Sequence, residues 1–196
     1  MRVIGGSERG RRLKVPKGRG IRPTSARVKE SLFNILPRDF SGLGVLDLFA
    51  GTGNLSIEAL SRGAAKAVLI DESPRATAAI RNNLRRFGLS ERAEVWTAPV
   101  FRSLRKLANA GETFDLVFLD PPYDRQWVGA TLDIFGEHQL LNATGRIIAE
   151  HSARESVRSR YEDLVLNDQR RYGDTLLSFF KNDVTLKLTE QGSNHG

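Results

Sequence analysis

The sequence predicts an α/β fold with a mostly parallel, doubly wound sheet that ends in an antiparallel hairpin. Five short apolar runs have the length of buried strands and span residues 45–49, 67–70, 93–96, 114–119 and 146–149. Amphipathic segments separate these runs, and strands that alternate with helices pair in parallel. The last two strand-like segments, residues 163–171 and 175–181, are joined by a short turn without a helix. We therefore expect them to form a terminal hairpin.

The N-terminal region stands apart from this alternation. Residues 2–15 mix apolar residues with glycine and arginine, which favours a short hairpin or an extended arm. A helix follows, opened by Pro23 with Thr24 or Ser25 as N-cap, and it closes before Pro37. Its apolar face comprises Val28, Leu32 and Ile35 or Leu36. We divide the chain into a basic arm and helix at residues 1–38, a main domain at residues 39–188 and a polar, disordered tail at residues 189–196.

Four helices are expected between the strands of the main domain. They span residues 55–62, 74–87, 100–110 and 127–139. The second of them has the clearest start, because Ser73 and Pro74 form an N-cap and first-turn pair.

The positive charge of the chain is concentrated at one end. Residues 1–38 hold eleven lysines and arginines against two glutamates, a balance of +9, so the other 158 residues carry −2 of the total of +7. A polyanionic partner that docks on the N-terminal region explains this, because neutralising phosphates releases counterions. The alternative is a basic tail that is simply solvated.

Composition excludes several classes of site. The chain has no cysteine, which removes disulfides, thiolate metal sites and cysteine nucleophiles. Its three histidines lie far apart in sequence, so we expect no metal site. No apolar run approaches the ~20 residues of a membrane span, and no signal-peptide pattern opens the chain. We expect a cytoplasmic monomer.

The first motif that carries chemistry follows the first core strand. Asp47 ends that strand, and Gly51 and Gly53 stand where the chain turns into a helix, at the ligand crevice of an open α/β sheet. Asp71 ends the second strand, where a carboxylate can accept hydrogen bonds from ribose hydroxyls. S-adenosylmethionine suits this pattern, because it offers an ammonium group for Asp47 and a ribose for Asp71.

The motif allows two other interpretations. A dinucleotide fits less well, because Ser56 occupies the third glycine position of the Gly-x-Gly-x-x-Gly fingerprint and Asp47 would point its charge at a pyrophosphate. The glycines could also merely form a tight turn between strand and helix.

The second motif is Asp120-Pro121-Pro122-Tyr123, directly after the fourth core strand. Two successive prolines lack backbone donors, so the loop presents acceptors. The Asp120 carboxylate and a proline carbonyl can accept both N–H bonds of an exocyclic base amine, which orients its lone pair for attack on a methyl group. Tyr123 can stack on the base. Asp120 acts either as an acceptor alone or also as the base that takes the proton; an ordinary Asp-Pro turn is the other interpretation.

The sequence resembles the bacterial 16S rRNA (guanine-N2)-methyltransferase family, the small-subunit methyltransferase D type. The resemblance runs from about residue 2 to residue 181. It is carried by the segments Arg2-Val-Ile-Gly-Gly, Arg9-Gly-Arg, Arg22-Pro-Thr, Arg27-Val-Lys-Glu-Ser-Leu-Phe-Asn, Asp47-Leu-Phe-Ala-Gly-Thr-Gly, Glu58-Ala-Leu-Ser-Arg-Gly-Ala, Asp120-Pro-Pro-Tyr and Arg171-Tyr-Gly-Asp-Thr. It implies a class I, Rossmann-like fold and methylation of a guanine N2 in small-subunit rRNA, within a ribosomal subunit or an assembly intermediate.

The resemblance also assigns roles to residues. It implies that the cofactor S-adenosylmethionine contacts Asp47, Phe49, Gly51, Gly53, Asp71, Glu72, Ala98 and Pro99. It implies that the target guanine contacts Asp120, Pro121, Pro122 and Tyr123. With the basic arm, it implies RNA contacts at Arg9, Arg11, Arg12, Arg22, Pro23, Thr24 and Arg27. Two positions depart from the family. The acidic residue after the second strand, often Glu in relatives, is Asp71 here, and the adjacent Glu72 is its rival for that role. Pro99 stands where relatives tend to place Asp or Asn near the adenine.

Other functions remain open on the residues alone. An adenine-N6 DNA or RNA methyltransferase would share Asp-Pro-Pro-Tyr, although 196 residues leave little room for a separate target-recognition region. Cytosine-C5 methylation is excluded because it needs a cysteine nucleophile. A small-molecule methyltransferase leaves the basic arm unexplained. A non-catalytic RNA-binding assembly factor would not need Asp47, Asp71 and Asp120 together.

Overall fold

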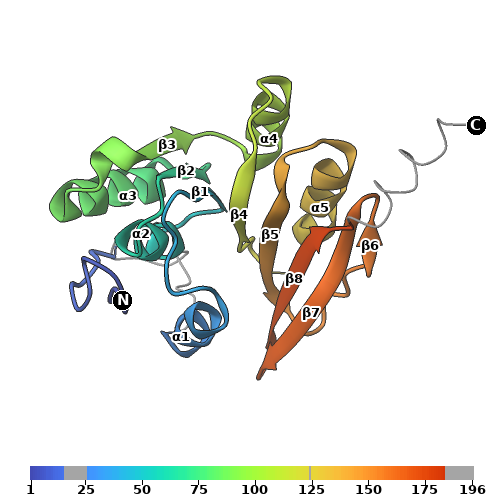
Figure 1. The fold of residues 1–196 in the computed structure, drawn as a ribbon, viewed down its shortest axis with the longest axis horizontal. Helices are drawn as coiled ribbons and strands as arrows, with labels where there is room; N and C mark the ends of the chain where they lie inside the picture. Colours follow the sequence, from blue (N-terminus) through green and yellow to red (C-terminus); the bar gives the residue numbers. More distant parts are fainter. Residues whose placement is uncertain (16–25, 124, 184–196) are drawn as a thin grey trace, which may run out of the picture.

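A single eight-stranded sheet organises the chain (Figure 1). The computed structural model describes residues 1–15, 26–123 and 125–183. Its strands are β1 Gly44–Leu48, β2 Lys66–Asp71, β3 Ala93–Thr97, β4 Phe114–Leu119, β5 Leu141–Ser152, β6 Arg160–Tyr161, β7 Leu164–Tyr172 and β8 Thr175–Asn182. They lie in the order β3-β2-β1-β4-β5-β8-β7-β6. The first five strands pair in parallel. Strand β8 then pairs antiparallel with β5, β7 antiparallel with β8, and β6 antiparallel with β7.

Helices cover both faces of this sheet. They are α1 Ala26–Ile35, α2 Asn54–Ser61, α3 Pro74–Phe87, α4 Val100–Asn109 and α5 Trp127–Glu137, with a short 3₁₀ turn at Ser90–Arg92. One core cluster joins residues of α1, α2 and α3 to one face of the sheet, and the other joins residues of α4 and α5 to the opposite face. The predicted doubly wound arrangement and its terminal hairpin are confirmed.

Local sequence accounts for the best-defined helix. The Oγ atom of Ser73 accepts a hydrogen bond from the backbone N–H of Ala76, and Pro74 occupies the first turn of α3. Gly88 ends the helix at φ 68°, in the left-handed region that glycine adopts without a Cβ penalty. Both ends of α3 are therefore encoded in its own sequence.

The C-terminal strands differ from the prediction in extent. Strand β5 has twelve residues, whereas the apolar run predicted only residues 146–149. Beyond Ala149 the strand continues because its antiparallel partner β8 extends further than β4, as far as the pair Ser152 and Thr175. The two-residue strand β6 was not predicted, since two residues carry no periodic pattern.

The N-terminal arm forms a small hairpin against α2 and α3. Arg2 and Arg12 form an antiparallel bridge, and Val3 and Leu13 are buried in the same core cluster as α2. The Nδ2 group of Asn83 on α3 donates to the carbonyl of Lys14 over 3.0 Å. The hairpin is therefore packed on the domain. Within the described ranges no helix is both long and apolar enough to cross a membrane.

Candidate functional site

Three carboxylates meet at the carboxyl edge of the parallel strands. Leu48 of β1 pairs with Ile70 of β2 on one side and with Leu119 of β4 on the other. Asp71 and Asp120 directly follow those partners, and Asp47 directly precedes Leu48. The backbone N–H of Asp120 also donates to the carbonyl of Leu48 over 3.5 Å. The alternation of strands and helices thus places all three acids around the end of β1, as the sequence predicts.

Asp47 is buried at the start of α2. Its Oδ2 atom accepts hydrogen bonds from the backbone N–H and the hydroxyl of Ser56, over 3.2 and 2.8 Å. Burial is the main cause that raises the pKa of Asp47 from 3.8 to about 7; the bonds from Ser56 lower it, and the charges of Asp120 and Asp71 raise it further. Among the described residues no group donates to the other oxygen, Oδ1. Asp47 therefore suits a cationic partner.

Asp71 holds the glycine loop in shape. Its Oδ2 atom accepts from the backbone N–H of Gly51 over 2.9 Å, and its Oδ1 atom accepts from that of Ser73 over 2.8 Å. Because a carboxylate has about four acceptor positions, further hydrogen bonds are available to a ligand. The same side chain thus links the end of β2 to the loop after β1.

Gly53 is required by the core as well as by the turn. Its φ is 71°, and a Cβ there would lie 3.1 Å from Leu69 and 3.3 Å from Ile80. The missing side chain makes room for buried neighbours rather than for a ligand at this position. Gly51 also has a positive φ, of 54°.

An aromatic group borders the glycine loop. Phe49 has a φ of 61°, which is uncommon for a bulky residue and marks a constrained site. Its ring stacks on Trp127 at 5.4 Å, and Trp127 also meets the edge of Phe101 at 6.0 Å. Sequence reasoning missed Trp127 and Phe101 because they come from α5 and α4. Their place in the first turn of a helix that follows a strand end is the signal that could have identified them.

The loop of residues 120–123, the candidate substrate loop, is fixed through Tyr123. The Tyr123 hydroxyl lies 3.3 Å from the Glu150 carboxylate, to which it donates, and 3.1 Å from the Thr175 hydroxyl. Glu150 belongs to β5 and Thr175 begins β8, so three segments meet at this point. Sequence reasoning missed Glu150 and Thr175. A carboxylate directly after the apolar run of residues 146–149 was the available signal.

The other residues predicted to contact the cofactor, the substrate or RNA differ in exposure. Arg9, Arg12 and Arg27 are exposed, as are Glu72, Pro99 and Pro122, whereas Pro121 is buried and Ala98 is half-buried. Arg11 bonds to Glu8 and to the carbonyl of Arg86, and its guanidinium lies 4.5 Å from the Phe87 ring centre. Arg22, Pro23 and Thr24 lie outside the described residues. In the described part of the chain, no His, Asp and Glu cluster has the geometry to hold a metal ion.

Comparison with protein families decides where the chain belongs. The model of the family Cons_hypoth95, "Conserved hypothetical protein 95", matches residues 1–181. The chain belongs to this family. The protein named "Putative rRNA methyltransferase YlbH" in Bacillus subtilis is 40% identical over 181 residues, which are 92% of this chain and 98% of that protein. Ribosomal RNA small subunit methyltransferase D of Escherichia coli is 36% identical over 150 residues, 76% of this chain and 74% of that protein. The resemblance expected from the sequence is confirmed.

Solved structures agree with this Cons_hypoth95 assignment. An Escherichia coli protein described as "Putative methyltransferase yhhF" has a TM-score of 0.79 and 32% identity, over 93% of this chain and 97% of that one. An RNA methyltransferase from Salinibacter ruber, in complex with S-adenosyl-L-homocysteine, has a TM-score of 0.63 over 82% and 94%. At 15% identity the second likeness shows the fold alone. The predicted class I methyltransferase fold is confirmed.

Proposed function

We propose that this protein transfers a methyl group from S-adenosylmethionine to the exocyclic N2 amine of a guanine in 16S rRNA. Membership of the family that includes ribosomal RNA small subunit methyltransferase D makes the chain an rRNA methyltransferase of that type. The assignment of guanine as the target base and N2 as the target atom goes beyond this family membership and rests on the chemistry of the site. One observation carries them, namely Asp120 and its two prolines at the strand end beside Asp47 and Asp71.

The described residues fit S-adenosylmethionine. The buried carboxylate of Asp47 has its Oδ1 atom available for the ammonium group, and Asp71 can accept from the ribose while it holds Gly51. Phe49 and the backbone of Gly53 would border the same ligand. Glu72 is the rival of Asp71 at the ribose, and Ala98 and Pro99 would lie near the adenine. When bound, S-adenosylmethionine supplies a methyl group activated by a sulfonium.

The substrate loop is suited to an amine. The Asp120 carboxylate and the carbonyl of Pro121 or Pro122 would accept the two N–H bonds of the guanine amine, which directs its lone pair away from the ring. Tyr123, held by Glu150 and Thr175, would stack on the base. Asp120 can also take the proton that the amine loses after transfer. A base bound this way must be unstacked from its neighbours, as bases are in other nucleic-acid methyltransferases.

The basic arm supports an RNA substrate. Arg9, Arg12 and Arg27 are exposed and would contact phosphates, and Arg22 to Thr24 would border the site. We assign residues 1–38 to RNA contact, residues 39–188 to methyl transfer and residues 189–196 to a tail. The proposed partner is small-subunit rRNA in a subunit or an assembly intermediate, bound by a monomer in the cytoplasm.

One assay tests the proposal. Labelled methyl transfer is measured in parallel to unmodified small subunits, free 16S rRNA and duplex DNA, and the product nucleosides are then identified. We expect N2-methylguanosine from an RNA substrate. N6-methyladenosine, or transfer to DNA alone, would contradict the proposed target. Cofactor binding by calorimetry with no transfer to any substrate would instead support a non-catalytic assembly factor.

A further inference from the structure

A second surface leads away from the substrate loop along the C-terminal strands. Directly paired residues of antiparallel strands project to the same face, and Ile148, Leu177 and Phe179 belong to the core cluster on the α1 side. By the alternation of β5, Arg146 and Glu150 project to that same face. Glu150 is the partner of Tyr123, and Arg146 lies four residues, about 13 Å, further along the strand.

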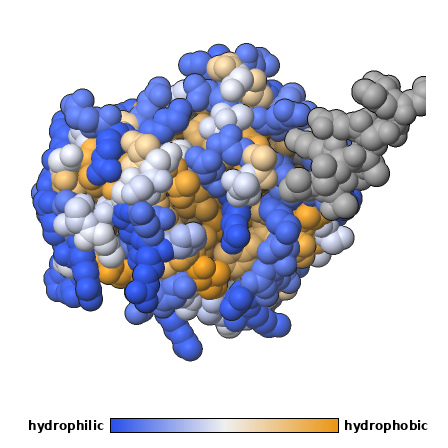
Figure 2. All heavy atoms as spheres, viewed as in Figure 1, coloured by the Kyte–Doolittle hydropathy of each residue, from blue (hydrophilic) through white to orange (hydrophobic). Residues whose placement is uncertain are grey.

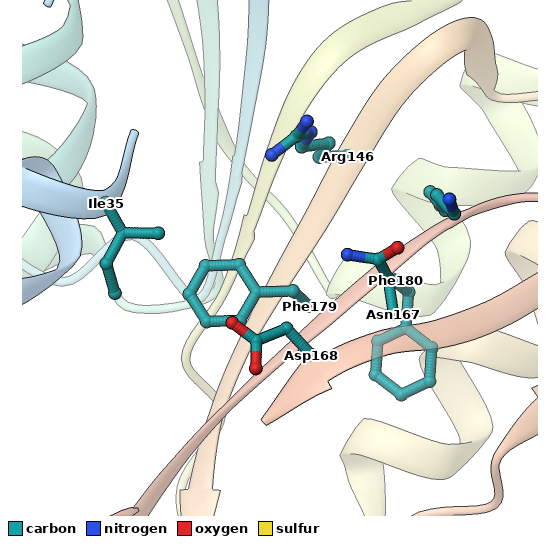
Figure 3. Close-up of a pocket in the computed structure, with 7 residues that line it drawn as sticks. Ile35, Arg146, Asn167, Asp168, Phe179 and Phe180 are labelled. Carbon is teal, nitrogen blue, oxygen red and sulfur yellow. The ribbon is translucent and has the colours of Figure 1, made fainter. Parts of the chain in front are cut away.

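This surface is hollowed between α1 and the strands β5, β8 and β7 (Figure 3). The groove is lined by Ile35, Arg146, Asn167, Asp168, Phe179, Phe180 and Lys181. Figure 3 shows Arg146 and Asp168 on either side of the Phe179 ring, and Ile35 facing that ring from the end of α1. The register of β7 on β8 shifts between Leu166 and Asp168, which displaces Asn167 from the regular pairing.

The floor of the groove is apolar and its rim is basic. Figure 2 shows apolar surface in the middle of this face, bordered by hydrophilic groups. Arg146 and Lys181 are paired across β5 and β8, and both are exposed. The acid in the described lining, Asp168, accepts a hydrogen bond from Nε of Arg170 over 2.9 Å. Because Asp168 is already paired with Arg170, the described lining holds no other acid to neutralise Arg146 and Lys181.

The geometry points to a single-stranded RNA segment, continuous with the target guanine, as the occupant of this groove. Its phosphates would contact Arg146 and Lys181, and a base or sugar would contact Ile35 and the edge of Phe179. Two features favour RNA. Cationic and apolar groups together form the usual site for a nucleic-acid strand. Arg146 also lies on the same face of β5 as Glu150, the residue that accepts a hydrogen bond from Tyr123. Sequence-specific RNA recognition mostly targets single-stranded loops and ends, so the nucleotides beside the target guanine need a path along the protein. This inference rests on the proposed function.

Charge reversal tests the groove. In the variant Arg146→Glu/Lys181→Glu we expect the KM for free 16S rRNA or small subunits to rise by about tenfold, and the salt dependence of RNA binding to flatten by about 1.4 to 1.8 in log–log slope, for two lost phosphate contacts. The kcat at saturation and the affinity for S-adenosylhomocysteine should change less than about twofold, because neither residue touches the reacting atoms. Arg105→Glu is the matched control, since Arg105 is exposed on α4, which packs on the opposite face of the sheet.

A second variant separates charge from shape. Ile35→Trp narrows the groove without altering its charge, so it should raise the KM for RNA while leaving the salt dependence as in the wild type. In Arg146→Lys the KM for RNA should stay close to the wild-type value, because the variant retains the cation. An unchanged KM in both Arg146→Glu/Lys181→Glu and Ile35→Trp, with an active wild type, overturns the groove as an RNA path. A wild type that methylates no RNA would instead contradict the proposed function itself.

Discussion

The ammonium nitrogen of Lys29 lies 2.8 Å from the Oε2 atom of Glu58, and both side chains are almost fully buried, 3% and 0% exposed. Lys29 belongs to α1 and Glu58 to α2, the helix that follows the glycine loop. The backbone N–H of Ile4 donates to the same Oε2 atom over 2.8 Å, and Nε of Arg62 donates to Oε1 over 3.0 Å. One buried carboxylate therefore joins the N-terminal hairpin and α1 to the element that shapes the candidate cofactor site.

Replacing Glu58 should destabilise the protein strongly. Burial lowers the pKa of Lys29, and the charge of Glu58 and its hydrogen bond oppose that shift. Glu58→Leu leaves this cation without its partner, so we expect a loss of about 3 to 5 kcal/mol in the free energy of unfolding, measured by urea denaturation. Lys29→Met/Glu58→Leu should recover part of the loss, because it removes the buried Lys29 charge, while Arg62 and the Ile4 N–H still lose their acceptor.

A surface ion pair provides the comparison for Glu58. Lys66 and Glu112 lie 3.3 Å apart with side chains 57% and 43% exposed. Glu112→Leu should change the free energy of unfolding by no more than about 1 kcal/mol. If Glu58→Leu proves equally mild, the buried carboxylate does not tie the hairpin and α1 to α2.

Asp47 should make stability depend on pH. Its folded pKa of about 7 lies above the ordinary value of 3.8, so between those pH values the folded protein holds a proton that the unfolded chain has lost. The free energy of unfolding should therefore fall as pH rises from about 4 to about 7, by at most about 1.4 kcal/mol per pH unit from this group. Asp47→Asn should lose this contribution. Urea denaturation at several pH values compares the two proteins, and parallel pH profiles would show that Asp47 titrates normally.

The three acids at the carboxyl edge could be placed from the sequence, because each is identified by the short apolar run next to it. Asp47, Asp71 and Asp120 each stand at or beside the end of an apolar run, and the ends of parallel strands share one edge. The capped helix α3 was equally predictable, since Ser73 and Gly88 mark its ends. Patterns within a few residues determine both.

Contacts between distant segments could not be placed in the same way. The bonds from Tyr123 to Glu150 and Thr175 depend on the register of β8 against β5, which no short pattern encodes. The buried Lys29 is a second case, because lysine is rarely buried unless it is paired. The Tyr123 contacts and the burial of Lys29 could be predicted only by knowing which strands and helices pack against each other.

Asp120→Ala should abolish methyl transfer and leave cofactor affinity nearly intact. The carboxylate is expected to accept an N–H bond of the target amine, whereas the candidate cofactor contacts come from Asp47, Gly51 and Asp71. Single-turnover transfer of labelled methyl and calorimetry with S-adenosylhomocysteine measure the two properties separately. Asp133→Ala, on the exposed side of α5, is the control and should keep full activity. Full turnover by Asp120→Ala would rule out the proposed role of this carboxylate.

The arginines at positions 9, 11 and 12 of the arm should divide into two kinds. Arg9 and Arg12 are exposed, so Arg9→Gln/Arg12→Gln should weaken RNA binding and lower its log–log salt slope by ~0.7 to 0.9 per lost phosphate contact. Arg11 is engaged by Glu8, the carbonyl of Arg86 and the Phe87 ring. Arg11→Gln should therefore loosen the hairpin, which faster amide hydrogen exchange at Val3 and Gly10 would report, since these two residues are hydrogen-bonded across it. An unchanged salt slope in Arg9→Gln/Arg12→Gln would mean that those two arginines are merely solvated.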